Sequence, residues 1–376
     1  MSEDQPHLFD TQPPAWEQDA AQSVCVARVV LPSGFAKQLD YAVPDHLRDQ
    51  AEPGRRLRVP LGRGNRSVVG YCVDLIHDAK VDRPLKEIDA VIDSRRLLSN
   101  ELLEITHWMA DYYLCPWGQV LDSVIPAGVR SGAGTRMATL LSVPEAIADA
   151  RSEQKLPPKQ AAVLDYVLAH PGSTPAEVAA AVGCTQAPVT TLRRKGLLES
   201  ESRRLAVEAD PEAVVPQEAH LEMNPDQANA LEKIMQAIQT GKHETILIHG
   251  VTGSGKTEVY LQAIREVVSY GRQAIVLVPE ISLTPQTVSR FRSRFGRVAV
   301  LHSHLSDVER HRQWARIAAG GAPVVVGARS AIFAPTPNLG LIVIDEEHES
   351  SFKQDSAPRY HAREVAERRA AAAGVP

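Results

Sequence analysis

The segment Gly250–Thr257 constrains this chain more than any other stretch. It reads Gly-Val-Thr-Gly-Ser-Gly-Lys-Thr, follows the apolar run Ile246–His249 and precedes the helical pattern Glu258–Arg265. Glycines let the backbone turn tightly, so several N–H groups converge on one anion, and the helix that follows adds its positive end. The order of strand, glycine loop and helix therefore predicts the phosphate-binding loop of a nucleoside-triphosphate site on a parallel α/β sheet.

The side chains of this loop suit ATP and Mg²⁺. Lys256 supplies a flexible cation for the outer phosphates and is a predicted catalytic residue, and the Thr257 hydroxyl is a predicted Mg²⁺ ligand. Gln227 lies upstream, where its amide can read an adenine edge or can simply begin the helix Asp226–Ala237. The predicted ATP-binding set is Gly250, Val251, Thr252, Gly253, Ser254, Gly255, Lys256, Thr257 and Gln227.

A second signal lies at the end of the apolar run Gly340–Ile344, which is typical of a central parallel strand. Acidic residues follow this run, and chemistry in open parallel sheets sits at the carboxyl ends of strands. We therefore predict that Asp345 binds Mg²⁺ and that Glu346 orients and deprotonates the attacking water. His348 belongs to the same turn and either couples the nucleotide site to its neighbours or caps the strand.

Length and composition set the limits of the whole chain. Its 376 residues suggest two or three domains. It has no run of 18 apolar residues and no apolar signal core, which predicts a cytoplasmic protein without a membrane span. The four cysteines never form a C-x-x-C pair, so we expect buried reduced thiols and neither disulfides nor a zinc site.

The net charge of −5 comes entirely from the first residues of the chain. Residues 1–23 carry five acids and no base, while the other 41 acids balance 41 bases. This tail is also rich in proline and poor in apolar residues, so we predict that it is a disordered acidic leader. The total charge therefore does not argue against a nucleic-acid partner.

The remaining sequence divides into segments of different character. Residues 24–128 contain three strand patterns and a surplus of basic residues, which suits either phosphates or a solvated strand face. Residues 129–155 are predicted to be a linker with one weak strand. Residues 156–208 show three short helices of winged-helix type, which contact either DNA or other domains. From residue 215 to 376, strand and helix patterns alternate as in a RecA-like α/β lobe.

Several motifs in order carry a resemblance to a known family. Beside the glycine loop and the acidic turn, these are Leu277–Gln286, Val300–Ser303, Gly327–Ala331, Ser350–Gln354 and Arg359–Arg363. In these motifs the chain closely resembles the bacterial primosomal replication-restart helicases (PriA) of helicase superfamily 2. Three N-terminal segments match the same family: Leu39–Tyr41, Arg58–Gly62 and Ala110–Tyr113. The resemblance covers essentially residues 24–376.

The resemblance implies a function in replication restart. The family binds abandoned forks, reads the 3′ end of the nascent leading strand, and couples ATP hydrolysis to 3′–5′ unwinding for primosome assembly. The implied partners are forked and single-stranded DNA with a 3′ end, other primosome proteins and single-stranded-DNA-binding protein.

The resemblance also places DNA contacts on particular residues. Asp40 and Gly62 match the 3′-end pocket, where Leu39 replaces the usual Phe, and this weakens the expected base stacking. Arg329 matches an arginine near single-stranded DNA phosphates. Phe352 and Tyr360 match an aromatic-rich loop that links DNA contact to hydrolysis, which implies that they stack on bases.

The end of the chain departs from the family pattern. It stops at Pro376, before the second RecA-like lobe with its arginine finger and before the paired cysteines that hold structural zinc in the family. We therefore expect a fragment that binds DNA and ATP but does not unwind alone, since a finger arginine contributes about 10³–10⁵ in rate. The alternatives are a non-motor module that binds DNA structures and another ATP-dependent DNA translocase.

Overall fold

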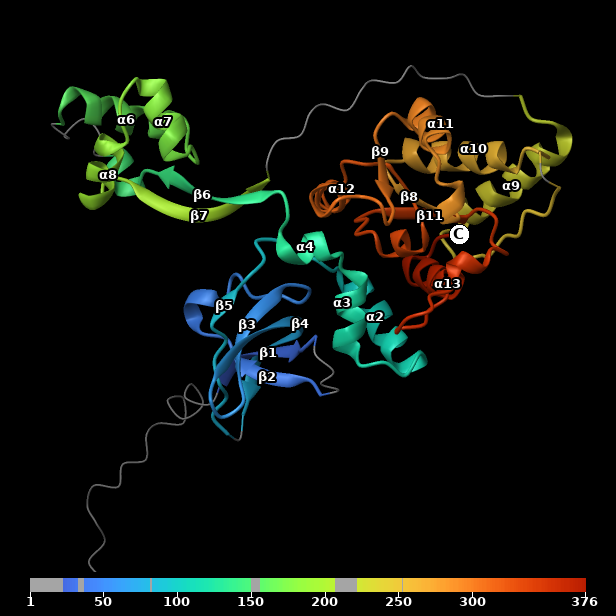
Figure 1. Cartoon of the computed structure of the whole chain (residues 1–376), viewed down its shortest axis with the longest axis horizontal. Coiled ribbons are helices and arrows are strands. Elements are labelled where there is room, and N and C mark those ends of the chain that lie inside the picture. Colours follow the sequence, from blue (N-terminus) through green and yellow to red (C-terminus); the bar gives the residue numbers. More distant parts are fainter. Residues whose placement is uncertain (1–22, 33–36, 82, 150–155, 207–221, 252) are drawn as a thin grey trace, which may run out of the picture. The chain divides into compact units, whose positions relative to one another are not determined.

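The computed structural model of the chain (Figure 1) falls into two compact units, which are described separately. One unit comprises residues 1–131 and 212–376, and the other comprises residues 132–211. The predicted acidic leader lies outside the described residues except for Ser23, and so does Thr252 of the glycine loop. The described residues are 23–32, 37–81, 83–149, 156–206, 222–251 and 253–376.

The first unit begins with an antiparallel sheet in the strand order β2-β1-β4-β3-β5. The three predicted strands of this region are present, and most residues of the first, β1, are buried. Alanine, valine and leucine side chains of β1 and β3 form its core. The strands are β1 (Ser23–Val30), β2 (Leu39–Ala42), β3 (Arg56–Leu61), β4 (Arg66–Lys80) and β5 (Ala90–Val91), with a short 3-10 helix η1 (Asp45–Leu47) after β2.

Three helices follow this sheet: α2 (Asn100–Tyr112), α3 (Trp117–Val124) and α4 (Ala127–Ser131). The Ser99 side chain accepts from the Leu102 amide and so caps α2. Gly118 lets α3 approach the end of β1 closely, because a Cβ there would lie 1.8 Å from the Leu31 carbonyl oxygen. The helices therefore pack directly on the sheet.

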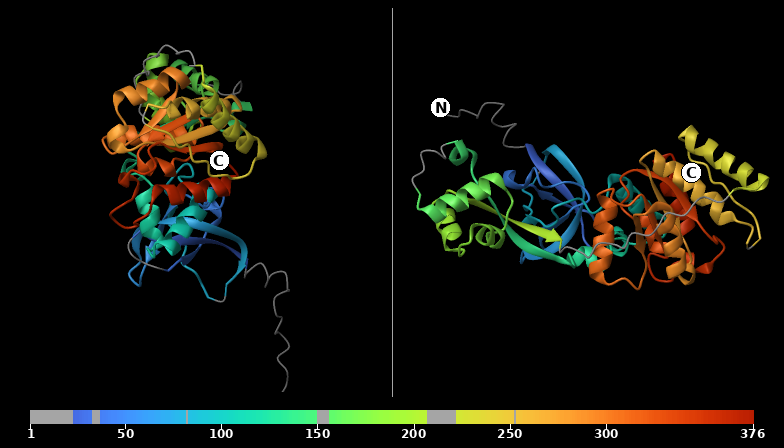
Figure 2. Two further views of the ribbon diagram at one scale, coloured as in Figure 1. Left: turned by 90° about the vertical axis from the view of Figure 1, so that its right-hand side faces the viewer. Right: turned by 90° about the horizontal axis from the view of Figure 1, so that it is seen from above.

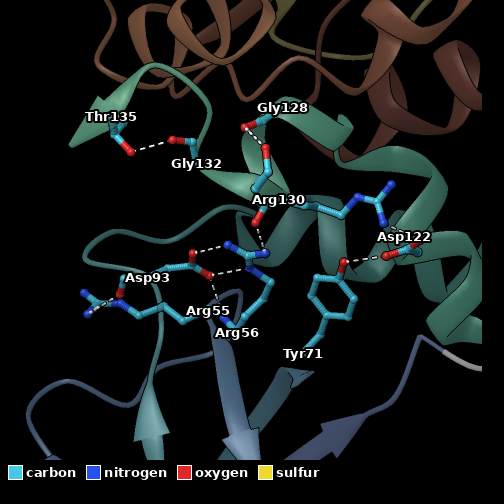
Figure 3. A network of polar contacts seen from close by, with 10 residues as sticks. Arg55, Arg56, Tyr71, Asp93, Asp122, Gly128, Arg130, Gly132 and Thr135 are labelled. Carbon is cyan, nitrogen blue, oxygen red and sulfur yellow. Dashed lines mark hydrogen bonds and ion pairs between the residues drawn. The ribbon is translucent and has the colours of Figure 1, made fainter. Parts of the chain in front are cut away.

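A buried polar network fastens the sheet to these helices (Figure 3). The Arg56 guanidinium, 6% exposed, forms a two-point ion pair with Asp93 at 2.6 and 3.0 Å and donates to the Arg130 carbonyl. Tyr71 donates to Asp122 at 3.1 Å, and Asp122 pairs with Arg130 at 2.5 Å. Because each buried charge has its partner, the network holds β3, β4, α3 and α4 in one arrangement.

The second unit is a two-stranded antiparallel ribbon of β6 (Thr135–Ser142) and β7 (Glu199–Ala206), with a cluster of short helices at one end (Figures 1 and 2). The longer helices of this cluster are α6 (Pro158–Ala169), α7 (Pro175–Val182) and α8 (Ala187–Arg194). Thr174 and Glu177 form a capping box at the start of α7, and Gly183 ends this helix at a φ of 65°. This arrangement fits the winged-helix prediction.

The segment predicted as a linker is more ordered than expected. Residues 129–155 contain β6 and a short helix, α5 (Glu145–Asp149), and β6 pairs with β7 over its whole length. Leu141 of β6 is fully buried among apolar residues of α6, α7 and α8. A local sequence pattern shows one weak strand here, but it does not show the distant partner that stabilises that strand.

The rest of the first unit is an α/β lobe, as predicted. Its parallel sheet has the order β11-β8-β10-β9 and is covered on both faces. Ala274 and Val276 of β8 pack against α9, α10 and α11, while Ile275 and Leu277 pack toward α12 and α13. The strands are β8 (Gln273–Leu277), β9 (Val298–Leu301), β10 (Val324–Gly327) and β11 (Leu339–Ile344). The helices are α9 (Pro225–Thr240), α10 (Lys256–Ser269), α11 (Pro285–Phe295), α12 (Asp307–Ala318) and α13 (Ala362–Ala373), with 3-10 helices η3 (Glu280–Ser282), η4 (Arg329–Phe333) and η5 (Ser350–Phe352).

The strand predicted before the glycine loop is not formed. Residues 246–249 have no strand assignment, although Ile246 and Ile248 pack against the apolar core beside α9 and α10. A cavity of about 780 Å³ separates this run from β11, whose outer edge has no strand beside it among the described residues. The amide of Ile342 on that edge donates to the carbonyl of Pro376. A strand needs a neighbour to complete its hydrogen bonds, and this run has none.

Helix α2 joins the sheet-bearing region to the lobe. Arg369 of α13, 1% exposed, donates to the Ile332 and Ala334 carbonyls and to the Thr336 hydroxyl, and it pairs with Glu101 of α2 at 3.2 Å. Apolar residues of α2, α3 and α13 belong to one continuous core. Among the described residues, no helix is long and apolar enough to span a membrane.

Candidate nucleotide and DNA sites

The glycine loop has the backbone of a phosphate cradle. Gly253 and Gly255 adopt φ values of 83° and 81°, in the left-handed region that favours glycine, and α10 begins directly after them at Lys256. The Lys256 ammonium folds back onto the loop and donates to the carbonyls of Gly250 at 2.7 Å and Val251 at 3.2 Å. The loop thus brings together the positive end of a helix and a lysine whose bonds to carbonyls can be exchanged for bonds to phosphate oxygens.

Gln227 contacts the loop directly. It completes the capping box of α9, because its side-chain oxygen accepts from the Asn224 amide. Its side-chain nitrogen donates to the Ser254 carbonyl at 3.0 Å. A Cβ on Gly255 would lie 2.3 Å from that nitrogen, so this contact also requires glycine. Gln227 therefore does help to begin α9, and its side-chain amide also contacts the glycine loop. Its recognition of adenine stays a prediction.

Asp345 lies at the carboxyl end of β11, as predicted, and its amide donates to the Leu277 carbonyl. The Tyr260 hydroxyl donates to its carboxylate at 3.0 Å. Burial raises the pKa of the Asp345 carboxyl, while the hydrogen bond from Tyr260 and the charge of Lys256 both lower that pKa. The bond from Tyr260 thus links α10, the helix that follows the glycine loop, to the acidic turn.

The residues after Asp345 form a tight turn. Glu346 has a φ of 48°, a left-handed conformation that is uncommon for a residue with a side chain and is found at functional sites. His348 is exposed, and its Nδ1 lies 3.8 Å from a Glu346 carboxylate oxygen. Glu347 pairs with Arg363 of α13 at 3.0 Å. Glu346 and His348 are therefore adjacent, and their predicted roles in hydrolysis and coupling stay predictions.

The donor set fits Mg²⁺ bound together with a nucleotide. Thr257 supplies a hydroxyl and Asp345 a carboxylate, and Mg²⁺ commonly takes one or two protein ligands and completes its six positions with phosphate oxygens and water. No group of three or more His, Cys, Asp or Glu side chains that could hold a metal ion occurs among the described residues.

The residues matched to a 3′-end pocket lie in the N-terminal sheet and in the turn after its strand β3. Asp40 on the edge strand β2 is exposed and pairs with Arg28 of β1 at 3.2 Å. Gly62 is exposed in the turn after β3, with a φ of 69° and open space where a Cβ would stand. Lys86 donates to the Gly62 carbonyl at 2.6 Å. The Tyr41 hydroxyl, next to Asp40 in sequence, donates to the carbonyl of Pro60, two residues before Gly62. Each of the two matched residues therefore has a cation as its partner, Arg28 for Asp40 and Lys86 for Gly62.

The aromatic residues matched to the DNA-coupling loop are not arranged as expected. Phe352 is 1% exposed and Tyr360 is 3% exposed. The Tyr360 ring packs edge-on against Phe333, and the Arg329 guanidinium lies 5.8 Å from its centre. Arg329 also donates to the Ser351 carbonyl at 3.2 Å. In this conformation neither ring offers a face to a base, so the prediction of base stacking by Phe352 and Tyr360 is wrong for the structure described; both rings instead fix the loop to the lobe.

Sequence reasoning missed residues that hold the site in place. Tyr260 was treated as part of an ordinary helix, and only its spacing of three residues after Thr257 could have indicated a place above the loop. Glu258 forms a buried ion pair with Arg294 of α11 at 3.1 Å. These contacts join segments distant in sequence, so periodicity did not indicate them.

Comparison with known proteins identifies the two parts of the first unit. Residues 28–126 match the 3′DNA-binding domain (3′BD) family of PriA, and residues 224–372 match the DEAD/DEAH box helicase family. The replication restart protein PriA of Bacillus subtilis (strain 168) is 33% identical over 402 residues, which cover 89% of this chain. The chain belongs to the PriA replication-restart helicase family.

Two further relatives agree with this assignment. The replication restart proteins PriA of Chlamydia pneumoniae and of Haemophilus influenzae (strain Rd) are 35% and 36% identical, over 90% and 91% of this chain. The aligned regions are 50%, 46% and 47% of the three relatives, so the chain spans about half the length of the curated relatives it matches. The DEAD/DEAH family uses ATP with Mg²⁺, and the RecA-like fold of the lobe agrees with this family.

Proposed function

We propose that this chain binds stalled or abandoned replication forks and hydrolyses ATP as the first motor lobe of a 3′–5′ DNA helicase. One contact carries the proposal: Tyr260 of α10, the helix that follows the glycine loop, donates a hydrogen bond to Asp345 at the end of β11. In this proposal Lys256 binds the outer phosphates, Thr257 and Asp345 bind Mg²⁺, and Glu346 orients and deprotonates the attacking water.

The N-terminal sheet supplies the DNA specificity in this proposal. Asp40 and Gly62 form the pocket for a free 3′ end, and Arg28 and Lys86 supply the nearby positive charge. The match of residues 28–126 to a 3′DNA-binding domain supports this placement. Arg329, at the start of η4, contacts the single-stranded backbone, and the relatives' role in replication restart makes primosome proteins and single-stranded-DNA-binding protein the proposed partners.

Steady-state ATP turnover tests the motor function. The purified chain is assayed with and without a fork that bears a 3′ end, and Lys256→Ala is compared with Lys233→Ala, which removes an exposed lysine of α9. We expect fork-stimulated turnover that Lys256→Ala abolishes and Lys233→Ala retains, with fork affinity the same in all three proteins. Equal loss of turnover in both variants contradicts the assigned role of Lys256.

The second candidate function is a non-motor module that binds fork DNA. The self-contained N-terminal sheet, with its own core and its cationic end, favours this candidate. It predicts intact fork binding and no ATP turnover at any DNA concentration. Strand displacement by this chain alone would contradict both this candidate and the expectation that one lobe does not unwind DNA.

A further inference from the structure

We propose that Tyr260 is a positioning residue for the Mg²⁺·nucleotide site: its hydroxyl holds Asp345 of the acidic turn in register with Thr257 of the glycine loop. This inference rests on the proposed nucleotide site and goes further, because neither the loop motif nor the acidic motif includes this tyrosine.

The position of Tyr260 follows from helix geometry. Residues three apart lie on the same face of a helix, so Tyr260 lies one turn after Thr257 in α10. The Tyr260 hydroxyl donates to an Asp345 carboxylate oxygen at 3.0 Å. Tyr260 therefore shares a helix face with Thr257, one predicted metal ligand, and bonds Asp345, the other.

Burial fixes this hydroxyl in place. Tyr260 is 6% exposed, and its ring stacks on Phe291 of α11 with the ring centres 6.5 Å apart. A second buried contact holds the same stretch of α10, because Glu258 accepts from both terminal nitrogens of Arg294. The packing around the ring therefore restricts its rotation. The hydroxyl is held where it can bond Asp345, the residue that follows β11.

The consequence concerns the carboxylate of Asp345. This side chain follows the last residue of an edge strand, and the next residue, Glu346, already has a left-handed backbone. Without the bond from Tyr260, the carboxylate loses the contact that orients it. Residues that orient metal ligands by hydrogen bonds typically change metal affinity by about 10–100-fold when they are mutated.

The test separates metal binding from nucleotide binding. Binding of a fluorescent ADP analogue is titrated first in EDTA and then at rising Mg²⁺ concentration, with the wild type, Tyr260→Phe and Tyr270→Phe. Tyr270 is a matched control, because it follows α10 and also donates its hydroxyl to a carboxylate, that of Glu266 at 2.7 Å, but lies away from the loop. Phenylalanine retains the ring and removes only the hydroxyl.

We expect Tyr260→Phe to bind the analogue normally in EDTA and to need about tenfold more Mg²⁺ for the half-maximal gain in affinity, while Tyr270→Phe matches the wild type. In an Asp345→Asn background, Tyr260→Phe should add little, since both changes act on one ligand. An unchanged Mg²⁺ requirement in Tyr260→Phe, or full additivity with Asp345→Asn, overturns the inference alone. A wild type that binds no nucleotide overturns the proposed site as well.

Discussion

Replacing the buried Arg369 by methionine should destabilise the first unit strongly. The guanidinium is 1% exposed and satisfies the carbonyls of Ile332 and Ala334, the hydroxyl of Thr336 and the carboxylate of Glu101. Methionine fills most of the volume of the side-chain stem but donates to none of these groups. The change therefore leaves buried acceptors without a donor and a carboxylate without its counter-charge.

The magnitude follows from the exposure of the partner groups. Removing one partner of a buried ion pair costs about 3–5 kcal/mol. Because the Glu101 side chain is 28% exposed and can retain some water, the loss should fall near the lower end, about 3 kcal/mol. Domains of this kind are stable by about 5–15 kcal/mol, so the variant should fold but unfold at a clearly lower urea concentration.

Urea unfolding followed by tryptophan fluorescence measures this loss, since Trp108, Trp117 and Trp314 all lie in or against the core that α2, α12 and α13 share. The matched control is Arg368→Met, which removes the neighbouring exposed arginine, 5.6 Å from the Trp108 ring, and should cost no more than about 1 kcal/mol. Glu101→Gln combined with Arg369→Met should cost less than the sum of the two changes. A loss below about 1 kcal/mol for Arg369→Met would refute the reasoning from burial.

Two further predictions concern DNA specificity and pH. Asp40→Ala should lower the ratio of the affinity for an oligonucleotide with a 3′-hydroxyl to the affinity for one with a 3′-phosphate. The control is Asp74→Ala, which removes the other carboxylate that pairs with Arg28 and should leave this ratio unchanged. Equal ratios in the two variants would count against the pocket. Burial and the Arg363 charge lower the pKa of His361, whose Nδ1 accepts from the Arg363 amide and caps α13. The stability that the neutral ring contributes is therefore present above the unfolded pKa, about 6.5, and is lost as the pH falls through the folded pKa. His361→Asn retains a capping oxygen, so urea midpoints at pH 8 and pH 5 should differ less in this variant than in the wild type, and an equal difference would contradict the assignment.

The sequence by itself determined the parts of this protein that depend on local order. The glycines at positions 253 and 255 predict left-handed turns because only glycine adopts them without strain, and both turns are present. The apolar run Gly340–Ile344 predicts the strand that forms most of β11, and the acidic turn follows it as the sequence indicates. The capping box at Thr174 was equally local.

Only the tertiary structure decided which distant groups meet. It placed Tyr260 against Asp345 and paired Arg294 with Glu258, and it buried Phe352 and Tyr360, which the sequence had suggested as surfaces for bases. It also left the run 246–249 without the strand that its composition predicts. The physical reason is common to these cases: burial, ion pairing and strand pairing each need a partner from elsewhere in the chain, and a residue's own neighbours in sequence do not reveal that partner.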